Sequence, residues 1–401
     1  MRVLLIGSGA REHALAWRLA QSPLLTELHA APGNPGIAQL GDCHPVRADD
    51  RDGLLGLAVT LASDLVVIGP EAPLVAGVAD ELRHAGFAVF GPGAPAARIE
   101  GSKSFAKAVL EAADVPTAAT LPVARPPCVI KADGLAAGKG VFVCRTASDV
   151  DEALGKLNAL GGAILIEELL EGREVSLFAI CDGARAVALG AAQDFKRAGD
   201  GDLGPNTGGM GAYSPVDWLE SAPELVAQIH QPVLDELARR GAPFVGCLFA
   251  GLMLTDDGPR VLEFNARFGD PETQALVPRL EGDLLEALAA AARGRAVDAL
   301  QEGDDAAVTV VLTGPEYPDR SDYSGVPIEG IEEVEEAGAL VFHGGTAMRD
   351  GRLVTNGGRI LSVTALAPEL EQARQRAYDA VERVRFEGVR FRTDIAAVSG
   401  A

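Results

Sequence analysis

Positively charged residues are scarce in this sequence. The 401 residues include 35 Lys and Arg against 57 Asp and Glu, so the formal net charge is −22. Such an excess of negative charge repels nucleic acid and anionic membrane surfaces over long distances. We therefore expect no nucleic-acid or membrane partner, and a phosphate-bearing ligand would have to be held by a local cluster of basic residues.

Cysteine pairs and long hydrophobic runs are also missing. No CxxC motif occurs, and no apolar run reaches the roughly 18–20 residues of a membrane-spanning helix. Most of the five cysteines lie in apolar runs, where free Cys acts as a small buried hydrophobe, as is typical of a reducing compartment. Met1 leads directly into a strand, so we expect a cytoplasmic protein without a signal peptide. The cysteines are Cys43, Cys128, Cys144, Cys181 and Cys247.

Length and patterning predict an α/β protein of about three packed units. Glycine is abundant, at 47 residues, which indicates many tight loops. Apolar strands alternate with helices over residues 1–100, and this alternation predicts a parallel sheet. We predict domain boundaries at 1–100, 101–306 and 307–401, with a small lobe at about 117–175 inside the second domain.

The most informative stretch is the glycine- and lysine-rich loop of residues 131–141, KADGLAAGKGV, between two apolar strands. Small residues let backbone N–H groups approach phosphate oxygens, and a lysine adds positive charge. The spacing is not that of a Walker A loop, because Gly follows Lys139 and a strand comes next. A glycine-rich hairpin with one exposed lysine is the structural alternative.

A second candidate phosphate site lies at the first turn of the chain. Strand 2–6 is followed by Gly7-Ser8-Gly9-Ala10-Arg11-Glu12, which opens a helix, and a helix N-terminus attracts anions. The dinucleotide fingerprint is incomplete, because its third Gly would fall at Glu12 and the ribose-binding acid is missing. We therefore disfavour a nicotinamide cofactor. Two interpretations remain: the turn binds a phosphate at the helix start, with Arg11 as its partner, or it is a tight turn without a ligand.

Glu71 lies shortly after another buried strand. A carboxylate at the C-terminal end of such a strand either contacts a ligand or is a solvated residue of the loop.

Residues 260–272, RVLEFNARFGDPE, are the candidate metal site. Residues i and i+2 of a strand share a face, so Glu263 and Asn265 should point one way while Leu262 and Phe264 point into the core. A carboxylate and an amide oxygen are hard ligands suited to Mg²⁺ on nucleotide phosphates. Arg267 could neutralise charge on a transferring phosphoryl group. By itself Glu-x-Asn is a common chance pattern.

Together these motifs resemble those of the ATP-grasp enzymes, and more closely those of the glycinamide ribonucleotide synthetase family. The resemblance implies an ATP-grasp fold with an N-terminal Rossmann-like (pre-ATP-grasp) domain and a C-terminal α+β domain. The motifs that carry it are VLLIGSGAREHALAW at 3–17, GPEAPLV at 69–75, EGSKSFAK at 100–107, KADGLAAGKGV at 131–141, GPNTGGMGAYSP at 204–215, EFNARFGDPETQ at 263–274 and TNGGRILSVTAL at 355–366.

The resemblance implies that ATP, glycine and 5-phosphoribosylamine give glycinamide ribonucleotide, ADP and phosphate, through glycyl phosphate, in purine biosynthesis. ATP and Mg²⁺ (or Mn²⁺) would be required, and we expect a monomer. Carried over residue by residue, Arg267 and Asp270 are catalytic, and Glu263 and Asn265 bind the metal. The ATP-binding residues would be Lys107, Lys131, Gly134, Gly138, Lys139, Gly140, Glu167, Glu168, Leu170 and Glu174. The substrate-binding residues would be Gly9, Arg11, Glu12, Glu71, Asp194, Asn206, Thr207, Gly208, Gly209 and Arg359.

More specifically, the resemblance implies that the adenine is bound by Glu167, Glu168 and Leu170 and the ribose by Glu174. Residues 118–128 are too short and too rich in proline for the helix that relatives carry there, so we expect the lobe at 117–175 to differ in shape from theirs. Another ATP-grasp ligase, such as a carboxylase acting on a different acid, is the main alternative. A nucleotide-binding regulator without turnover is a further one, against which the intact Lys131, Glu263 and Arg267 argue.

Overall fold

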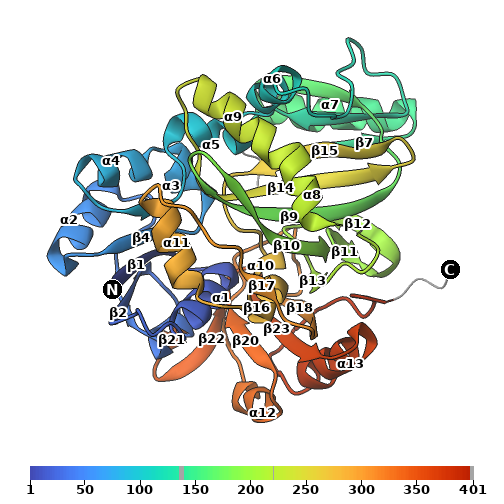
Figure 1. The fold of residues 1–401 in the computed structure, drawn as a ribbon. Helices are drawn as coiled ribbons and strands as arrows, with labels where there is room; N and C mark the ends of the chain where they lie inside the picture. The colour runs from blue at the N-terminus through green and yellow to red at the C-terminus, as the bar shows by residue number, and fades with distance from the viewer. Residues whose placement is uncertain (135–139, 220, 398–401) are drawn as a thin grey trace.

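The computed structural model describes residues 1–134, 140–219 and 221–397. Figure 1 shows the N-terminal part on the left, a small lobe at the upper right and the C-terminal part at the bottom, around a large central sheet. None of the helices in these described ranges is both long and apolar enough to cross a membrane.

The first hundred residues form a parallel five-stranded sheet in the order β3-β2-β1-β4-β5. Residues 3–6 of β1 are fully buried, as expected for a parallel strand covered on both faces. This confirms the alternation predicted from the sequence. The strands are β1 Arg2–Gly7, β2 Glu27–Pro32, β3 Asp42–Cys43, β4 Leu65–Ile68 and β5 Val89–Phe90, and the helices are α1 Ala10–Leu19, α2 Arg51–Leu61, α3 Glu71–Val75 and α4 Val78–His84, with a 3₁₀ turn at Ile37–Gln39.

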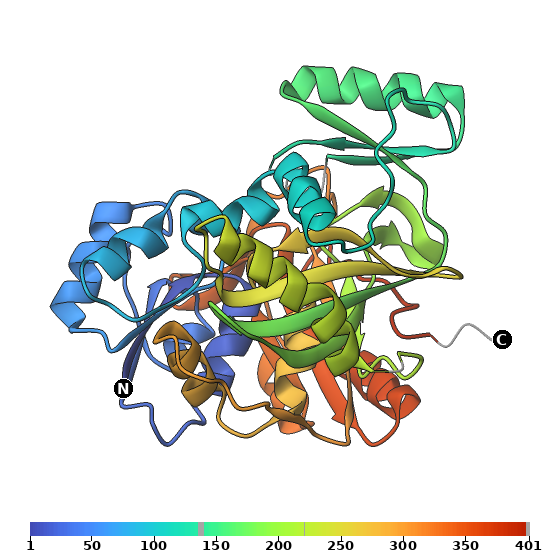
Figure 2. The ribbon, with the colours of Figure 1, turned by 45° about the horizontal axis from the view of Figure 1, so that its top comes forward.

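Two helices, α5 (Ala94–Gly101) and α6 (Lys103–Ala112), lead to the lid lobe, as we name residues 117–175. The lobe contains β6 (Cys128–Ala132), β7 (Val141–Cys144) and β8 (Ile164–Glu168) in the order β7-β6-β8, and α7 (Ala147–Leu160). It has its own small core, to which Cys128, Ile130 and Leu157 belong. Strand alternation therefore turns Lys131 to the face away from α7. Figure 2 shows this lobe projecting from the body.

The central sheet has eight strands in the order β15-β14-β9-β10-β13-β18-β23-β20. Strands β13 and β18 are antiparallel neighbours, so the C-terminal strands continue the sheet of the preceding region. The three-domain division stays a prediction, although this hydrogen bonding joins its second and third parts. The strands are β9 Arg173–Asp182, β10 Ala186–Asp194, β13 Gly211–Ser214, β14 Val245–Thr255, β15 Gly258–Asn265, β18 Ala306–Thr313, β20 Leu340–His343 and β23 Arg359–Ala367.

Helices and small sheets surround this central sheet. The helices are α8 Ala222–Leu225, α9 Gln231–Arg239, α10 Glu272–Leu276, α11 Leu284–Ala292, α12 Ile331–Glu336 and α13 Leu370–Val381, with a π-helical turn at Val226–His230 and 3₁₀ turns at Asp200–Asp202 and Val277–Arg279. The small sheets pair β11 Arg197–Gly199 with β12 Leu203–Asn206, β16 Leu280–Glu281 with β17 Gln301–Glu302, and β22 Arg352–Asn356 with both β19 Ser324–Pro327 and β21 Thr346–Arg349.

Strand β15 differs from its predicted alternation. Its pairing with β14 shifts register so that Leu262 has no partner residue, which makes it the extra residue of a β-bulge. Val261 and Phe264 are buried whereas Leu262 is only half-buried. The prediction that Leu262 points into the core is therefore wrong, but Glu263 and Asn265 still lie beyond the bulge at the strand end.

The segment before β6 has the predicted irregular form. Residues 118–127 contain no helix, and Thr120 forms an antiparallel bridge with Glu167. The backbone N–H of Leu121 donates to the Ile166 carbonyl at 2.8 Å. This proline-rich segment therefore takes up part of the outer edge of β8.

Candidate nucleotide and substrate site

Two lysines share one carboxylate on the inner face of the lid lobe. Lys107 on α6 and Lys131 on β6 each place their Nζ 2.6 Å from a different oxygen of Glu167 on β8. All three side chains are at most 10% exposed. Lys131 Nζ also donates to the Leu262 carbonyl at 3.0 Å, which joins the lobe to the bulge of β15. A buried anion held by two ammonium groups marks a site that can take phosphate oxygens.

In this structure the partners of Glu167 are lysines. The resemblance implies that Glu167 contacts the adenine, whereas in the structure its carboxylate forms ion pairs with the two lysines. Glu168 is engaged as well, because its N–H donates to the Ala119 carbonyl at 3.0 Å and its Oε1 accepts the Ala119 N–H at 2.8 Å. Residues 119–121 therefore pair with the edge of β8 as far as Glu168.

The predicted metal ligands come together with an arginine at the end of β15. The Arg267 Nη2 atom donates to Asn265 Oδ1 at 3.3 Å and lies 3.0 Å from Glu100 Oε1. The Arg267 Nε atom lies 3.3 Å from Glu71 Oε2. Burial would raise the pKa of Glu263, but Lys196 and Lys131 outweigh it and hold that pKa below its ordinary value. Glu263 is thus an ionised hard ligand at neutral pH.

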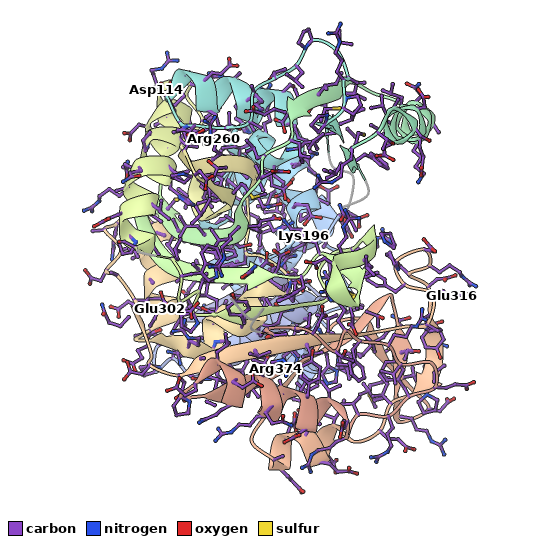
Figure 3. The ribbon with its side chains drawn as sticks, turned by 90° about the vertical axis from the view of Figure 1, so that its right-hand side faces the viewer. Asp114, Lys196, Arg260, Glu302, Glu316 and Arg374 are labelled. Carbon is purple, nitrogen blue, oxygen red and sulfur yellow. The ribbon has the colours of Figure 1, made fainter. Side chains whose placement is uncertain are left out.

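Lys196 was not predicted from the sequence, yet it lies among the acids of this site. It forms an ion pair with Glu174 at the start of β9. Its positive charge also opposes the effect of burial, which raises the pKa of Asp194. Figure 3 labels Lys196 between the lid lobe at the top and the C-terminal strands at the bottom. The sequence QDFKR at 193–197 could have pointed to this lysine, but its spacing does not indicate which acidic residues the lysine contacts.

A cavity of about 580 Å³ opens between the N-terminal turn and the C-terminal strands. Its lining includes Gly9, Asn34, Asp270, Gly345 and Arg359. The cavity is the size of a small-molecule site. Its walls come from residues 8–34 and from residues that follow more than 200 positions later, Asp270 and 317–362, which sequence patterns cannot bring together.

Arg359 and Asp270 form an ion pair in this cavity wall. Arg359 Nη2 lies 2.8 Å from Asp270 Oδ2, and Arg359 Nη1 donates to the carbonyls of Asp270 and Gly208. The other carboxylate oxygen, Asp270 Oδ1, accepts from Gln274 Nε2 at 2.7 Å. Gly208 N–H in turn donates to the Tyr317 hydroxyl at 2.9 Å. Asp270, predicted to be catalytic, and Arg359, predicted to bind substrate, therefore share one cluster.

The turn between β1 and α1 is filled by its own glutamate. Glu12 is 2% exposed, and its carboxylate accepts the Gly9 N–H at 2.6 Å and the Arg11 Nε at 2.5 Å. A Cβ added to Gly69 would come within 2.2 Å of Glu12 Oε1, which explains why glycine is needed there. Glu12 thus occupies the anion position that the turn would offer to a phosphate, and its contact with substrate stays a prediction.

Three family models match the chain. They are the phosphoribosylglycinamide synthetase N domain over residues 1–100, the ATP-grasp (A) domain over 101–273 and the C domain over 307–398. The chain belongs to the phosphoribosylglycinamide synthetase family.

Individual relatives agree along the whole length of this family member. A phosphoribosylamine–glycine ligase from Streptomyces coelicolor is 51% identical, with 99% of both chains covered. One from Brucella melitensis is 47% identical, covering 98% of this chain and 97% of the relative. The crystal structure of the phosphoribosylamine–glycine ligase from Thermotoga maritima is 34% identical with a TM-score of 0.85, covering 98% of this chain and 100% of that one. The predicted ATP-grasp fold is confirmed.

The remaining predicted residues of this synthetase-family chain are placed as follows. Gly138 and Lys139 lie outside the described residues. At the borders of that gap, the Gly134 carbonyl accepts from Lys103 Nζ at 3.0 Å, and the Gly140 carbonyl accepts the Ala132 N–H at 2.7 Å. Asn206 is the last residue of β12. The Thr207 hydroxyl donates to the Lys196 carbonyl at 2.9 Å and accepts the Gly209 N–H. Leu170 is the second residue after the end of β8.

Proposed function

We propose that this chain joins glycine to 5-phosphoribosylamine at the expense of ATP, giving glycinamide ribonucleotide, ADP and phosphate. The observation that carries this proposal is the full-length family match combined with an intact cluster of Lys107, Lys131 and Glu167 facing β15. The reaction class follows from the chemistry, since a carboxylate becomes an acyl donor only when one oxygen is converted into a phosphate leaving group.

ATP binds between the lid lobe and β15. The triphosphate takes the place of the Glu167 carboxylate as a partner of Lys107 and Lys131, because both groups are anions whose oxygens accept charge-assisted hydrogen bonds from ammonium groups. This leaves Glu167 free to accept a hydrogen bond from the adenine amino group, as the family resemblance implies. Lys131 remains tied to the Leu262 carbonyl and so aligns the phosphates with the end of β15.

Glu263 and Asn265 hold Mg²⁺ or Mn²⁺. The fit rests on two oxygen ligands at one strand end and on a glutamate whose pKa is held low. Across the described ranges there is no group of three or more His, Cys, Asp or Glu side chains that could hold a metal. A carboxylate and an amide oxygen would suit a hard divalent cation. When bound, the cation supplies charge neutralisation on the phosphates.

Arg267 stabilises charge as phosphate is transferred. A glycine carboxylate oxygen attacks the γ-phosphorus and the bond to ADP breaks, so that glycyl phosphate forms. The Arg267 guanidinium, directed by Asn265 and two glutamates, faces the charge that develops on the transferred group. Asp270 and Asp194 are the acids proposed to hold the glycine ammonium; each oxygen of Asp270 retains a second lone pair for it.

5-Phosphoribosylamine occupies the 580 Å³ cavity, with Arg359 at its wall. Its amine nitrogen attacks the acyl carbon of glycyl phosphate, inorganic phosphate leaves, and the nitrogen loses a proton. Tyr317 and Arg359 hold the Gly208 turn against this cavity, so the amine is presented from a fixed wall. We further propose that the protein works as a cytoplasmic monomer.

The direct test is a substrate assay with the purified full-length protein. ADP release should require glycine, 5-phosphoribosylamine and Mg²⁺ together, and glycinamide ribonucleotide should appear in equal amount. ADP release that needs bicarbonate and biotin instead would favour a carboxylase and overturn the proposal. Elution at the size of one 41.5 kDa chain would support the monomer.

A further inference from the structure

Glu100 is a buried carboxylate that ties two neighbouring groups together. It lies near the end of α5, with its side chain 7% exposed. Its Oε2 accepts the Ala266 backbone N–H at 2.8 Å, and its Oε1 lies 3.0 Å from Arg267 Nη2. One side chain thus holds both the backbone just after β15 and the guanidinium of the next residue.

The two acids on Arg267 are not equivalent. Glu71, the first residue of α3, is 35% exposed and lies 3.3 Å from Arg267 Nε. Glu100 is nearer and less exposed, and it carries the additional backbone bond. Since an arginine has many rotamers, a guanidinium keeps one orientation only where its partners are themselves fixed. Glu100 meets that condition better than the more exposed Glu71 does.

We propose that Glu100 is a positioning residue for phosphoryl transfer, acting through Arg267 without touching nucleotide or glycine. This inference rests on the role of Arg267 proposed above. Glu100 fixes the guanidinium at the end of β15, beside Asn265, so that the charge is in place before the transition state forms. A purely structural ion pair would stabilise the fold and have no specific effect on turnover.

A double-mutant cycle separates these two roles. The kcat and KM values are measured for the wild-type chain, Arg267→Ala, Glu100→Gln and the double variant. Glutamine keeps an oxygen for the Ala266 N–H and loses the charge. We expect Glu100→Gln to lower kcat by about 10- to 100-fold while the KM for ATP stays within about threefold. In the Arg267→Ala background the same change should lower kcat by less than about threefold.

The matched control is Glu236→Gln on α9. Glu236 is a carboxylate with a side chain 6% exposed that pairs with Arg239 and Arg240 at 2.6 Å each, and it belongs to no part of the proposed site. Its replacement should leave kcat unchanged. An equal loss of kcat in Glu236→Gln would mean that losing any buried charge partner slows the enzyme, and would overturn the inference.

The possible outcomes distinguish the two proposals. Wild-type kcat in Arg267→Ala would remove the role of Arg267, and the inference with it. A large loss in Arg267→Ala beside wild-type kcat in Glu100→Gln, or losses that simply multiply in the double variant, would overturn the Glu100 assignment alone. If Glu100→Gln does not fold, Glu100→Asp replaces it in the cycle. Its carboxylate is one methylene too short to reach both partners, so its loss of kcat must also vanish in the Arg267→Ala background.

Discussion

Lys131 Nζ lies 2.6 Å from Glu167 Oε2, across the pairing of β6 with β8 in the lid lobe. The two residues are also offset neighbours of the same antiparallel ladder, so their side chains share one face of the lobe. The face that carries them is the face turned away from the lobe's own core.

We predict that Lys131→Ala raises the KM for ATP at least about tenfold, a loss of about 1.4 kcal/mol. The lysine supplies charge to the phosphates and anchors the lobe to the Leu262 carbonyl, while the glycine site is left intact. Initial-rate measurements with each substrate varied in turn check this. Lys156→Ala, an exposed lysine of α7 in the same lobe, should change nothing. Equal rises of KM for all three substrates would contradict the assignment.

Replacement of the predicted metal ligand should abolish metal-dependent turnover. We expect Glu263→Ala to lower kcat by about 100-fold or more, because an ionised ligand beside three lysines is lost. The far-ultraviolet circular dichroism spectrum should not change, since the side chain lies at a strand end and outside the core. Asp257→Ala, in the exposed turn of the same β14–β15 hairpin, is the control. Wild-type dependence on Mg²⁺ concentration in Glu263→Ala would disprove the metal site.

Arg359→Ala should weaken the binding of 5-phosphoribosylamine much more than the binding of ATP. The arginine pairs with Asp270 and holds the Gly208 carbonyl at the cavity wall, so its removal loosens that wall. A rise of about tenfold or more in the KM for 5-phosphoribosylamine, with the KM for ATP within about threefold, is expected in steady-state kinetics. Arg376→Ala on α13, which donates to the Leu366 carbonyl at an exposed position, should have no such effect. A larger change for ATP than for 5-phosphoribosylamine would contradict the placement of this substrate.

Acid should destabilise the contact between α1 and β20. Burial and the neighbouring His343 lower the pKa of His13 to about 3, and burial lowers that of His343 to about 4. His13 Nδ1 accepts the His343 backbone N–H at 2.8 Å, which requires that nitrogen to be unprotonated. The unfolded chain binds protons from about pH 6.5 downward while the folded chain does not, so stability is present above that pH and falls as pH decreases.

For His13 alone this linkage amounts to about 2 kcal/mol between pH 8 and pH 5. We expect the loss of unfolding free energy between these pH values, measured by urea titration, to be smaller by about that amount in His13→Gln. His84→Gln, at an exposed position on α4, should lose as much as the wild-type chain. An unchanged loss in His13→Gln would mean that other groups account for the acid sensitivity.

Local pattern was enough to predict that the proposed metal-binding residues lie together at a strand end. Strand periodicity gave Glu263 and Asn265 a common side, and they remained beyond the bulge of β15. It could not predict the bulge itself, because an extra residue depends on pairing with β14. For the same reason Leu262 was assigned to the core, whereas its carbonyl is what Lys131 contacts.

Contacts between distant segments could not be predicted from the sequence. Nothing near Glu167 indicated that two lysines would take its carboxylate, and nothing near Glu100 indicated a partner 167 positions away. The pairing of β13 with β18, which joins the predicted second and third domains in one sheet, likewise leaves no local signal. These features arise from tertiary packing, which overrides local preferences.

The most direct measurement is a crystal structure of the full chain with a non-hydrolysable ATP analogue, Mg²⁺ and glycine. We predict the triphosphate between Lys131 and Asn265, with Glu167 released from at least one lysine and glycine beside Arg267. A triphosphate bound far from both Lys131 and Asn265 would contradict the proposed site as a whole.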